Sequence, residues 1–162
     1  LDAVNLRLPT VMVRPGRPNK AASSFVSAIV REPLLGLETN CPVPDDFAVW
    51  ICSPRATIEW FLHAAAMDTA PLGLDRGINP PGRSLTVAKI LGALEQVAGK
   101  AAREKVGFVF DKEVFAIVQG WPGAFAATRA RRLGFKEQEP MEEIIRGFIE
   151  DDLAATKAER GM

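Results

Sequence analysis

The sequence of 162 residues contains no tyrosine, a single histidine and only two cysteines. His63 and two cysteines that stand apart in the sequence are too few ligands for a His-based zinc site. The cysteines are also too few for a disulfide framework, and we interpret Cys52, which falls in an expected strand, as a small buried thiol. The composition therefore excludes a His-based zinc site and a disulfide-rich scaffold, and we expect no metal.

Common catalytic and phosphate-binding motifs are absent as well. The sequence has no Gly-x-Ser-x-Gly, no Gly-x-x-x-x-Gly-Lys-Ser/Thr and no Gly-x-Gly-x-x-Gly. These absences exclude a nucleophile elbow, a P-loop and a dinucleotide-binding glycine loop within this chain.

Long hydrophobic runs and an excess of one charge are also missing. No apolar run approaches the ~20 residues of a membrane-spanning helix, and no signal peptide is evident. Lys+Arg and Asp+Glu each number 20, so the formal net charge is zero. This balance argues against binding nucleic acid or an anionic membrane through bulk charge. We expect a protein of reducing, cytoplasmic surroundings.

What the sequence does contain is the composition of a globular protein. Hydrophobic residues make up 48% and charged residues 25%, and the length suggests one domain with a sizeable core. The segment from Leu6 to Val13 predicts a strand buried on both faces, with Pro9 at its start. Pro15, Gly16 and Pro18 would end it before a helix from Ala21 to about Arg31, which Asn19 could cap. The core face of this helix would carry Phe25, Ala28 and Ile29.

Later segments predict short strands and several helices. Residues 37–46 read as a polar loop, and residues 47–52 as a short strand. Ser53 then caps a helix that has Pro54 in its first turn. Apolar residues recur along it at helical spacing: Ile58, Phe61, Leu62, Ala65 and Ala66. So many helices cannot all cover so little sheet, so we expect the first strand to lie in a sheet whose other strands are encoded elsewhere. The opening on Leu1 rather than Met fits a fragment or a processed product.

The segment Arg14-Pro-Gly-Arg-Pro-Asn-Lys20 is the strongest candidate binding loop. It joins rigid backbone, cations and an amide at a strand-to-helix junction, where free helix N–H groups favour anionic or polyhydroxylated ligands. Ser23 and Ser24 add hydroxyls on the first turn. The alternative is a surface turn whose Arg and Lys side chains are solvated.

Other residues carry weaker signals. Arg31 at a helix C-terminus suits the helix dipole, whereas Arg55 in a first turn is electrostatically unfavourable and so a better ligand candidate. We interpret Trp50, Trp60 and Trp121 as packing residues rather than stacking platforms.

Several short motifs occur in an order that resembles a known family. The first strand is followed by Arg14-Pro-Gly-Arg-Pro-Asn19, Ala21-Ala-Ser-Ser-Phe-Val-Ser27 and Ile29-Val-Arg-Glu-Pro-Leu34. Then come Trp50-Ile-Cys-Ser-Pro-Arg-Ala56, Ile78-Asn-Pro-Pro-Gly82 and Ala130-Arg-Arg-Leu-Gly-Phe135. Together they resemble the C-terminal half of extended short-chain dehydrogenases/reductases, the NAD-dependent epimerase/dehydratase enzymes. The nearest subgroup is the D-erythronate dehydrogenase-like or nucleoside-diphosphate-sugar epimerase-like proteins.

The resemblance implies an α/β fold, the C-terminal part of a Rossmann-type structure. One central parallel strand would accompany a mostly helical substrate-binding subdomain with short strands. Residues 1–36 would hold the last part of the dinucleotide-binding sheet, residues 37–155 the substrate-binding subdomain, and residues 156–162 a frayed tail.

The resemblance also assigns residues by position. Pro15 and Gly16 match the segment beside the nicotinamide, and the substrate-facing positions fall on Asn19, Ser23, Ser24, Arg31 and Arg55. The family's Gly-rich loop and catalytic Tyr-x-x-x-Lys are missing from this chain, so it holds no catalytic residue. NAD would be bound mainly by the missing N-terminal half.

The function implied is that of an NAD-dependent oxidoreductase or epimerase acting on a hydroxyl of a sugar acid or nucleotide sugar. This chain would supply the wall of the substrate pocket and be inactive alone. We expect a homo-oligomer or association with an N-terminal half, and neither nucleic acid nor membrane as a partner. The alternative is a non-catalytic binding or oligomerisation module of the same fold, whose exposed sheet edge would need a partner.

Overall fold

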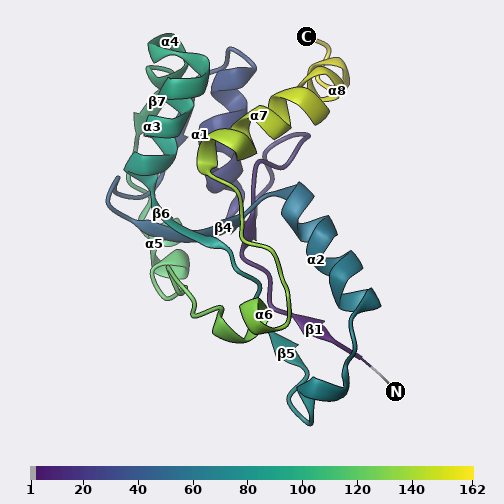
Figure 1. The fold of residues 1–162 in the computed structure, drawn as a ribbon. Helices are drawn as coiled ribbons and strands as arrows, with labels where there is room; N and C mark the ends of the chain where they lie inside the picture. The colour runs from purple at the N-terminus through teal and green to yellow at the C-terminus, as the bar shows by residue number, and fades with distance from the viewer. Residues whose placement is uncertain (1–2) are drawn as a thin grey trace.

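The computed structural model describes residues 3–162 as small sheets surrounded by helices (Figure 1). β1 (Asn5–Leu6) pairs in parallel with β5 (Gly77–Ile78). A second sheet has the order β2 (Thr10–Val11), β4 (Ala48–Cys52), β6 (Arg83–Thr86), with β2 parallel and β6 antiparallel to β4. A third pairs β3 (Thr39–Cys41) with β7 (Val106–Phe108) in parallel.

Helices make up most of the remaining structure. They are α1 (Ser24–Leu34), α2 (Pro54–Ala66), α3 (Val87–Ala98), α4 (Lys100–Arg103), α5 (Lys112–Val118), α6 (Thr128–Arg132), α7 (Met141–Asp151) and α8 (Leu153–Glu159), with a short 3-10 helix η1 (Ala70–Leu72). Among residues 3–162, none of these helices is both long and apolar enough to cross a membrane.

The first strand predicted from the sequence is broken at Pro9 into β1 and β2, which belong to different sheets. The expectation of one strand over Leu6–Val13 was therefore wrong. Pro9 has no N–H to donate to a ladder, so pairing with β5 ends before it and pairing with β4 begins after it. Met12 and Val13 are buried at 0% and 1% exposure even though they follow β2.

Helix α1 begins later than predicted, and Asn19 does not cap it. The N-cap is Ser23, and the side-chain oxygen of Asn19 instead accepts a hydrogen bond from the backbone N–H of Ala21. The predicted core face is confirmed, since Phe25, Ala28 and Ile29 are all buried.

The expected polar loop at residues 37–46 contains β3, whose pairing with β7 had no local sequence signal. By contrast, the next strand and helix were predicted well. β4 occupies Ala48–Cys52, and the Ser53 Oγ accepts from the N–H of Ala56 at 3.0 Å to cap α2.

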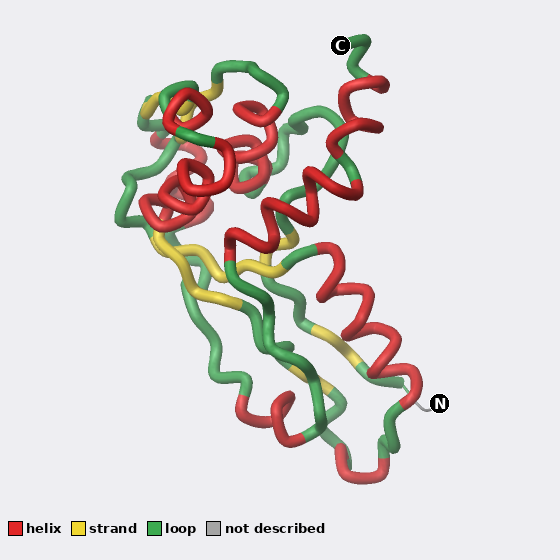
Figure 2. Tube along the Cα trace, turned by 45° about the horizontal axis from the view of Figure 1, so that its top comes forward, coloured by secondary structure: helices red, strands yellow, loops and turns green. Residues whose placement is uncertain are grey.

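Two hydrophobic cores flank the middle sheet. The larger gathers side chains from α1, α3, α7 and β4, including Ile29, Ile51, Leu94 and Ile145. The smaller lies around Cys52, Trp60, Ile78 and Phe135. In Figures 1 and 2, α1, α3, α4 and α7 lie above the level of β4 and β6, while β1, β5 and α6 lie below. Because β4 contributes to both cores, it links the two parts of the molecule.

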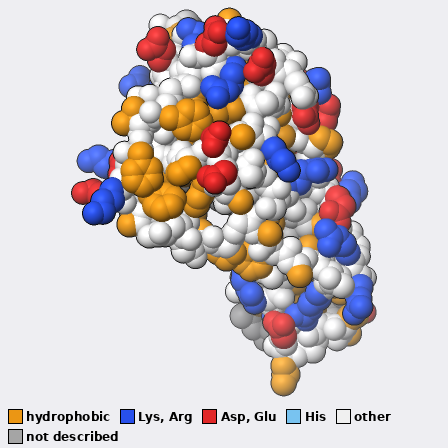
Figure 3. All heavy atoms as spheres, turned by 90° about the vertical axis from the view of Figure 1, so that its left-hand side faces the viewer, with side chains coloured by type: hydrophobic (Ala, Val, Ile, Leu, Met, Phe, Trp, Pro, Cys, Tyr) orange, Lys and Arg blue, Asp and Glu red, His pale blue; other side chains and the backbone are white. Residues whose placement is uncertain are grey.

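Two apolar areas remain uncovered by the described residues. On α2, the periodic residues Ile58, Phe61 and Leu62 are 61%, 52% and 66% exposed, while Ala56 and Trp60 face inward. The second area includes Phe108, Val109, Phe110 and Ile117. Figure 3 shows hydrophobic side chains gathered on the side that carries β7 and α5.

The structure places a helix in the segment for which the sequence suggested a frayed tail. Of residues 156–162, those up to Glu159 belong to α8. Arg160 then donates to a carboxylate oxygen of Glu32 at 2.7 Å, so the end of the chain is tied to α1.

The close approach at Gly82 allows a stability test. A Cβ there would lie 2.5 Å from Pro9 Cγ, 2.7 Å from Trp50 Nε1 and 2.8 Å from the Ile51 oxygen. We predict that Gly82→Ala lowers the free energy of unfolding by about 1–3 kcal/mol, as overpacking does. Urea denaturation measures the change.

Gly92 provides the matched control for this test. It lies in the middle of α3, and beyond the backbone of its own helix no heavy atom comes within 4 Å of the place a Cβ would take. Gly92→Ala should raise the free energy of unfolding by about 0.5–1 kcal/mol, because alanine loses less backbone entropy in a helix. Equal effects of the two substitutions would contradict the packing at Gly82.

Candidate functional site

A cavity of about 260 Å³ lies where β1 ends and the chain passes into β2. Ligands in open α/β sheets bind outside the carboxyl ends of parallel strands, and β1 is parallel to β5. The cavity is lined from three segments: Arg7, Leu8 and Thr10; residues 47–50; and Trp121, Pro122 and Phe125. This cavity is the candidate site.

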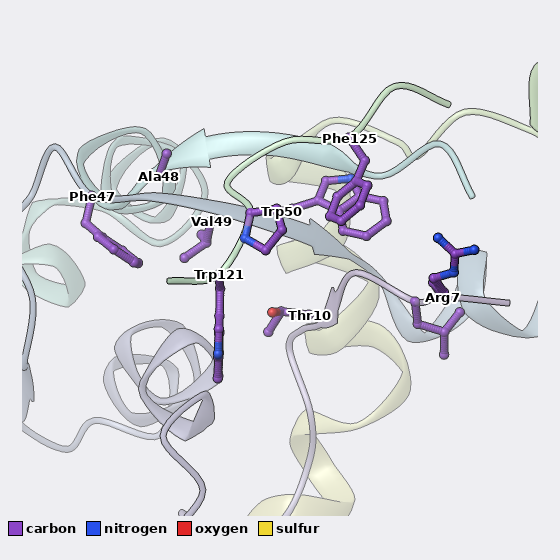
Figure 4. A pocket seen from close by; sticks show the side chains of 10 residues that line it. Arg7, Thr10, Phe47, Ala48, Val49, Trp50, Trp121 and Phe125 are labelled. Carbon is purple, nitrogen blue, oxygen red and sulfur yellow. The ribbon is translucent and has the colours of Figure 1, made fainter. Parts of the chain in front are cut away.

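Four of the ten residues that line the cavity are aromatic: Phe47, Trp50, Trp121 and Phe125. In Figure 4, the ring of Phe125 lies over the indole of Trp50, and Trp121 lies on the side of the cavity where Phe47 is. The ring centroids of Trp50 and Phe125 are 4.3 Å apart. Trp50 is buried, whereas Trp121 and Phe125 are 41% and 38% exposed. Such a wall suits the apolar C–H face of a small ligand.

Two polar side chains complement the wall. Arg7 lies at the end of the cavity opposite Trp121 and Phe47, and the Thr10 hydroxyl lies between (Figure 4). Arg7 is exposed, and its positive charge contributes to lowering the pKa of Asp75, after the hydrogen bond from Gly77 and the charge of Arg129. The arrangement provides one cation and one hydroxyl against an aromatic surface.

The strand that leads into the cavity has one unpaired edge within residues 3–162. The backbone N–H groups of Asn5 and Arg7 donate to Arg76 and Ile78 on the β5 side at 3.0 and 2.9 Å. β1 pairs with no other strand of the described chain. The alternating N–H groups of Leu6 and Leu8 therefore point away from β5, beside the candidate site.

The loop proposed from the sequence lies outside this cavity, and side chains of α1 hold its backbone. The N–H of Asn19 donates to Ser24 Oγ at 3.1 Å, and the N–H of Arg14 donates to Ser27 Oγ at 3.1 Å. Ser23 makes no side-chain cap bond. The sequence-predicted residues that do not line the cavity are Pro15, Gly16, Asn19, Ser23, Ser24, Arg31 and Arg55.

The two candidate arginines are engaged in internal contacts. Arg31 is 2% exposed and donates to the backbone oxygen of Arg14 at 2.8 Å and to Glu32 at 2.8 Å. Arg55 is exposed and binds Glu150 and Asp151 on α7 at 2.7 and 2.6 Å. These carboxylates offset the unfavourable placement of Arg55 in a first helical turn.

Other chemically capable side chains have structural roles. His63 Nε2 lies 2.7 Å from the backbone oxygen of Leu133, and its ring packs edge-on against Phe135. Trp60 is 1% exposed, which confirms its interpretation as a packing residue. Trp50 and Trp121, which were interpreted in the same way, line the cavity instead. Cys52 is fully buried as predicted, and burial raises the pKa of its thiol to about 12.

Sequence reasoning missed Arg7, Thr10 and Phe125 as site residues. A usable signal was present, because Pro9 ends the ladder of β1 and so marks the true carboxyl end of the strand. The Pro/Gly-rich segment instead led the prediction to Pro15, where the chain turns into α1. The approach of Phe125 to Trp50 joins positions 75 residues apart and leaves no local pattern.

Two known proteins match nearly the whole chain. D-erythronate dehydrogenase of Haemophilus influenzae is 44% identical over 153 residues, which are 94% of this chain and 49% of that protein. D-erythronate dehydrogenase of Cupriavidus necator is 44% identical over 151 residues, 93% of this chain and 47% of that protein. The chain thus spans about half the length of these relatives. No family model matches.

Solved structures agree with these matches. The crystal structure of a nucleoside-diphosphate-sugar epimerase from Agrobacterium tumefaciens superposes with a TM-score of 0.90 at 41% identity, covering 94% of this chain and 45% of that one. The resemblance to the C-terminal half of extended short-chain dehydrogenases/reductases is confirmed. A GalE-like L-threonine dehydrogenase from Cupriavidus necator shares the fold, with a TM-score of 0.80 at 23% identity over 96% of this chain and 48% of that one.

The expected fold class is confirmed with the resemblance: an α/β structure in which parallel pairs accompany many helices, as in the C-terminal regions of extended short-chain dehydrogenases/reductases. The small sheets hold few strands for so many helices, as the sequence suggested.

The cysteines give a direct chemical test of this region. At pH 8 a thiol whose pKa is about 12 stays protonated, and the thiolate is the reactive form. Cys41, also buried, has its pKa raised by burial. We predict that both thiols react with a disulfide reagent about 100-fold more slowly in the native chain than in urea. Rapid native labelling would contradict their burial.

Proposed function

We propose that this chain is the C-terminal half of an NAD-dependent dehydrogenase that oxidises a secondary hydroxyl of a sugar acid. It would supply one wall of the substrate pocket. The cavity at the carboxyl end of β1 is the observation that supports this function best. The 44% identity to two D-erythronate dehydrogenases points to the same substrate class.

The polar groups of the cavity favour a small acid. An arginine can hold a carboxylate through two parallel hydrogen bonds, and Arg7 is the one cation among the lining residues. Thr10 can bind a substrate hydroxyl, and the indole faces can pack against sugar C–H groups. A nucleotide sugar is the second candidate, favoured by the similarity to the Agrobacterium tumefaciens epimerase.

The remaining chemistry belongs to groups outside this sequence. NAD would accept the hydride, and a Tyr-x-x-x-Lys helix like that of the family would take the hydroxyl proton. Because this sequence has no tyrosine and no Gly-x-Gly-x-x-Gly, we assign both tasks to an N-terminal half. The residues described here would orient the acid and exclude water from the reacting hydroxyl.

The residues first assigned by resemblance take different parts in this proposal. Pro15 and Gly16 remain proposed neighbours of the nicotinamide. Asn19, Ser23 and Ser24 remain proposed substrate contacts. Arg31 and Arg55 already bind internal carboxylates, so we propose Arg7 in their place as the ligand of the substrate carboxylate.

The N-terminal half would dock on two adjoining features. One is the unpaired edge of β1, which could receive a parallel strand. The other is the exposed face of α2 formed by Ile58, Phe61 and Leu62. An apolar helix face in contact with water marks a surface that another polypeptide covers.

The function is tested by complementation. The chain is mixed with the part of Haemophilus influenzae D-erythronate dehydrogenase that it does not match, and NADH formation from NAD is followed with D-erythronate or a UDP-sugar. We expect no turnover from the chain alone and turnover of D-erythronate by the mixture. Association without turnover of either substrate would support a non-catalytic module and overturn the enzymatic proposal.

Docking is tested separately by Leu62→Glu. Leu62 is 66% exposed, so the substitution should change the stability of the chain by no more than about 0.5 kcal/mol. It should weaken association with the N-terminal part at least about 10-fold, because a charge would be buried at the interface. Calorimetric titration measures the affinity. Gln96→Glu, at an exposed position of α3, adds the same charge and should leave the affinity unchanged.

The role of Arg7 is tested in the active mixture. Arg7→Gln should lower kcat/KM for the sugar acid about 10- to 100-fold, because the substrate carboxylate loses its hydrogen bonds to a charged group. Arg7→Lys should retain part of the activity, because it keeps the charge but loses the planar pair of donors. Arg132→Gln removes an exposed cation elsewhere and serves as the control. Equal activity of the Arg7 and Arg132 variants would show that Arg7 does not bind the substrate carboxylate.

A further inference from the structure

The loop after β2 is fixed to α1 through both polar backbone groups of Arg14. Its N–H donates to Ser27 Oγ at 3.1 Å, and its carbonyl oxygen accepts from Arg31 Nη1 at 2.8 Å. Ser27 and Arg31 stand one helical turn apart, so they lie on the same face of α1. The path of the chain into Pro15 and Gly16 is therefore set by these side chains.

Arg31 is held in turn by a buried chain of charges. Its Nε donates to one carboxylate oxygen of Glu32 at 2.8 Å, and Arg160 Nη1 donates to the other at 2.7 Å. The exposed fractions of the three side chains are small: 3% for Arg31, 6% for Glu32 and 15% for Arg160. A charge removed from water to this extent needs its partner, because an unpaired buried ion is costly.

The end of α8 also lies against the loop itself. Gly16 has φ +81°, and the nearest heavy atom to a Cβ built there is Glu159 Oε2, at 3.8 Å. Thr156, one turn earlier on α8, is 1% exposed. Helix α8 is thus seated over the loop, and Figure 1 shows the C-terminal end of the chain on the same side of the molecule as α1.

We propose that Arg31 and Arg160 are positioning residues that, through Glu32, let the C-terminal helix fix the loop of residues 14–20. This inference rests on the proposed function, in which Pro15 and Gly16 border the nicotinamide. It differs from a substrate-binding role for Arg31, since its Nε and Nη1 already bind Glu32 and Arg14, and its Nη2 is buried with no partner in the described part of the chain.

The first test is amide hydrogen exchange of the 162-residue chain without any ligand. In Arg160→Gln, the amides of Arg14 and Asn19, which are hydrogen-bonded to Ser27 and Ser24, should exchange about 10-fold faster or more, because the loop opens locally. Amides in β4 should be unchanged. Arg160→Lys, which keeps the charge, should restore part of the protection. Glu32→Gln is a poorer test, because it leaves two arginines without their shared carboxylate and can unfold the chain.

Two control variants separate positioning from general weakening. Arg146→Gln breaks an exposed ion pair with Glu143, and Ile145→Val removes a methyl group from the larger core. Neither should selectively expose residues 14–20. The proposal is overturned if Arg160→Gln leaves exchange in the loop unchanged, or if Ile145→Val accelerates the loop just as much as Arg160→Gln does.

The second test uses turnover by the mixture with the N-terminal part. Arg160→Gln should lower kcat about 10-fold while KM for the sugar acid stays within about twofold, because a loop beside the reacting atoms acts mainly in the transition state. An active wild-type mixture with unchanged kcat in this variant would overturn the positioning role. An inactive wild-type mixture would overturn the proposed function instead, and the exchange result would still decide whether α8 fixes the loop.

Discussion

The unpaired edge of β1 is the constraint on which the rest of the structure depends. β1 forms a parallel pair with β5 and, within residues 3–162, has no second neighbour. Parallel strands occur almost only in sheets covered on both faces. In the proposed enzyme, the N-terminal half would also cover the exposed apolar face of α2, and the chain spans about half the length of its relatives.

Much of the fold could be predicted where the signals are local. Ser53 followed by Pro54 marked the start of α2, and the spacing of Phe25, Ala28 and Ile29 marked the buried face of α1. β3 was missed because its only stabilising partner among the described strands, β7, lies far along the chain. The apolar periodicity of α2 predicted a helix correctly, but periodicity alone does not tell whether Ile58 and Leu62 meet a core from this chain or from elsewhere.

The site was harder to predict than the fold. A Pro/Gly-rich loop with cations is the stronger local signal, whereas the cavity is assembled from residues near 7–10, 47–50 and 121–125. The loop nevertheless has an ordered structure of its own, maintained by Ser24, Ser27 and Arg31. The hydroxyls of Ser24 and Ser27 and the guanidinium of Arg31 therefore serve first to build the turn, and Arg31 and Arg55 are already paired with carboxylates.

The exchange rates of the Leu6 and Leu8 amides, measured with and without the N-terminal part of a D-erythronate dehydrogenase, test the central claim most directly. These N–H groups point away from β5, whereas those of Asn5 and Arg7 bind it. We expect Leu6 and Leu8 to exchange rapidly in the chain alone and to become strongly protected in the complex, as hydrogen bonds to a new parallel strand form. Equally strong protection of both amides in the isolated chain, or none in a stable complex, would contradict an incomplete sheet at β1.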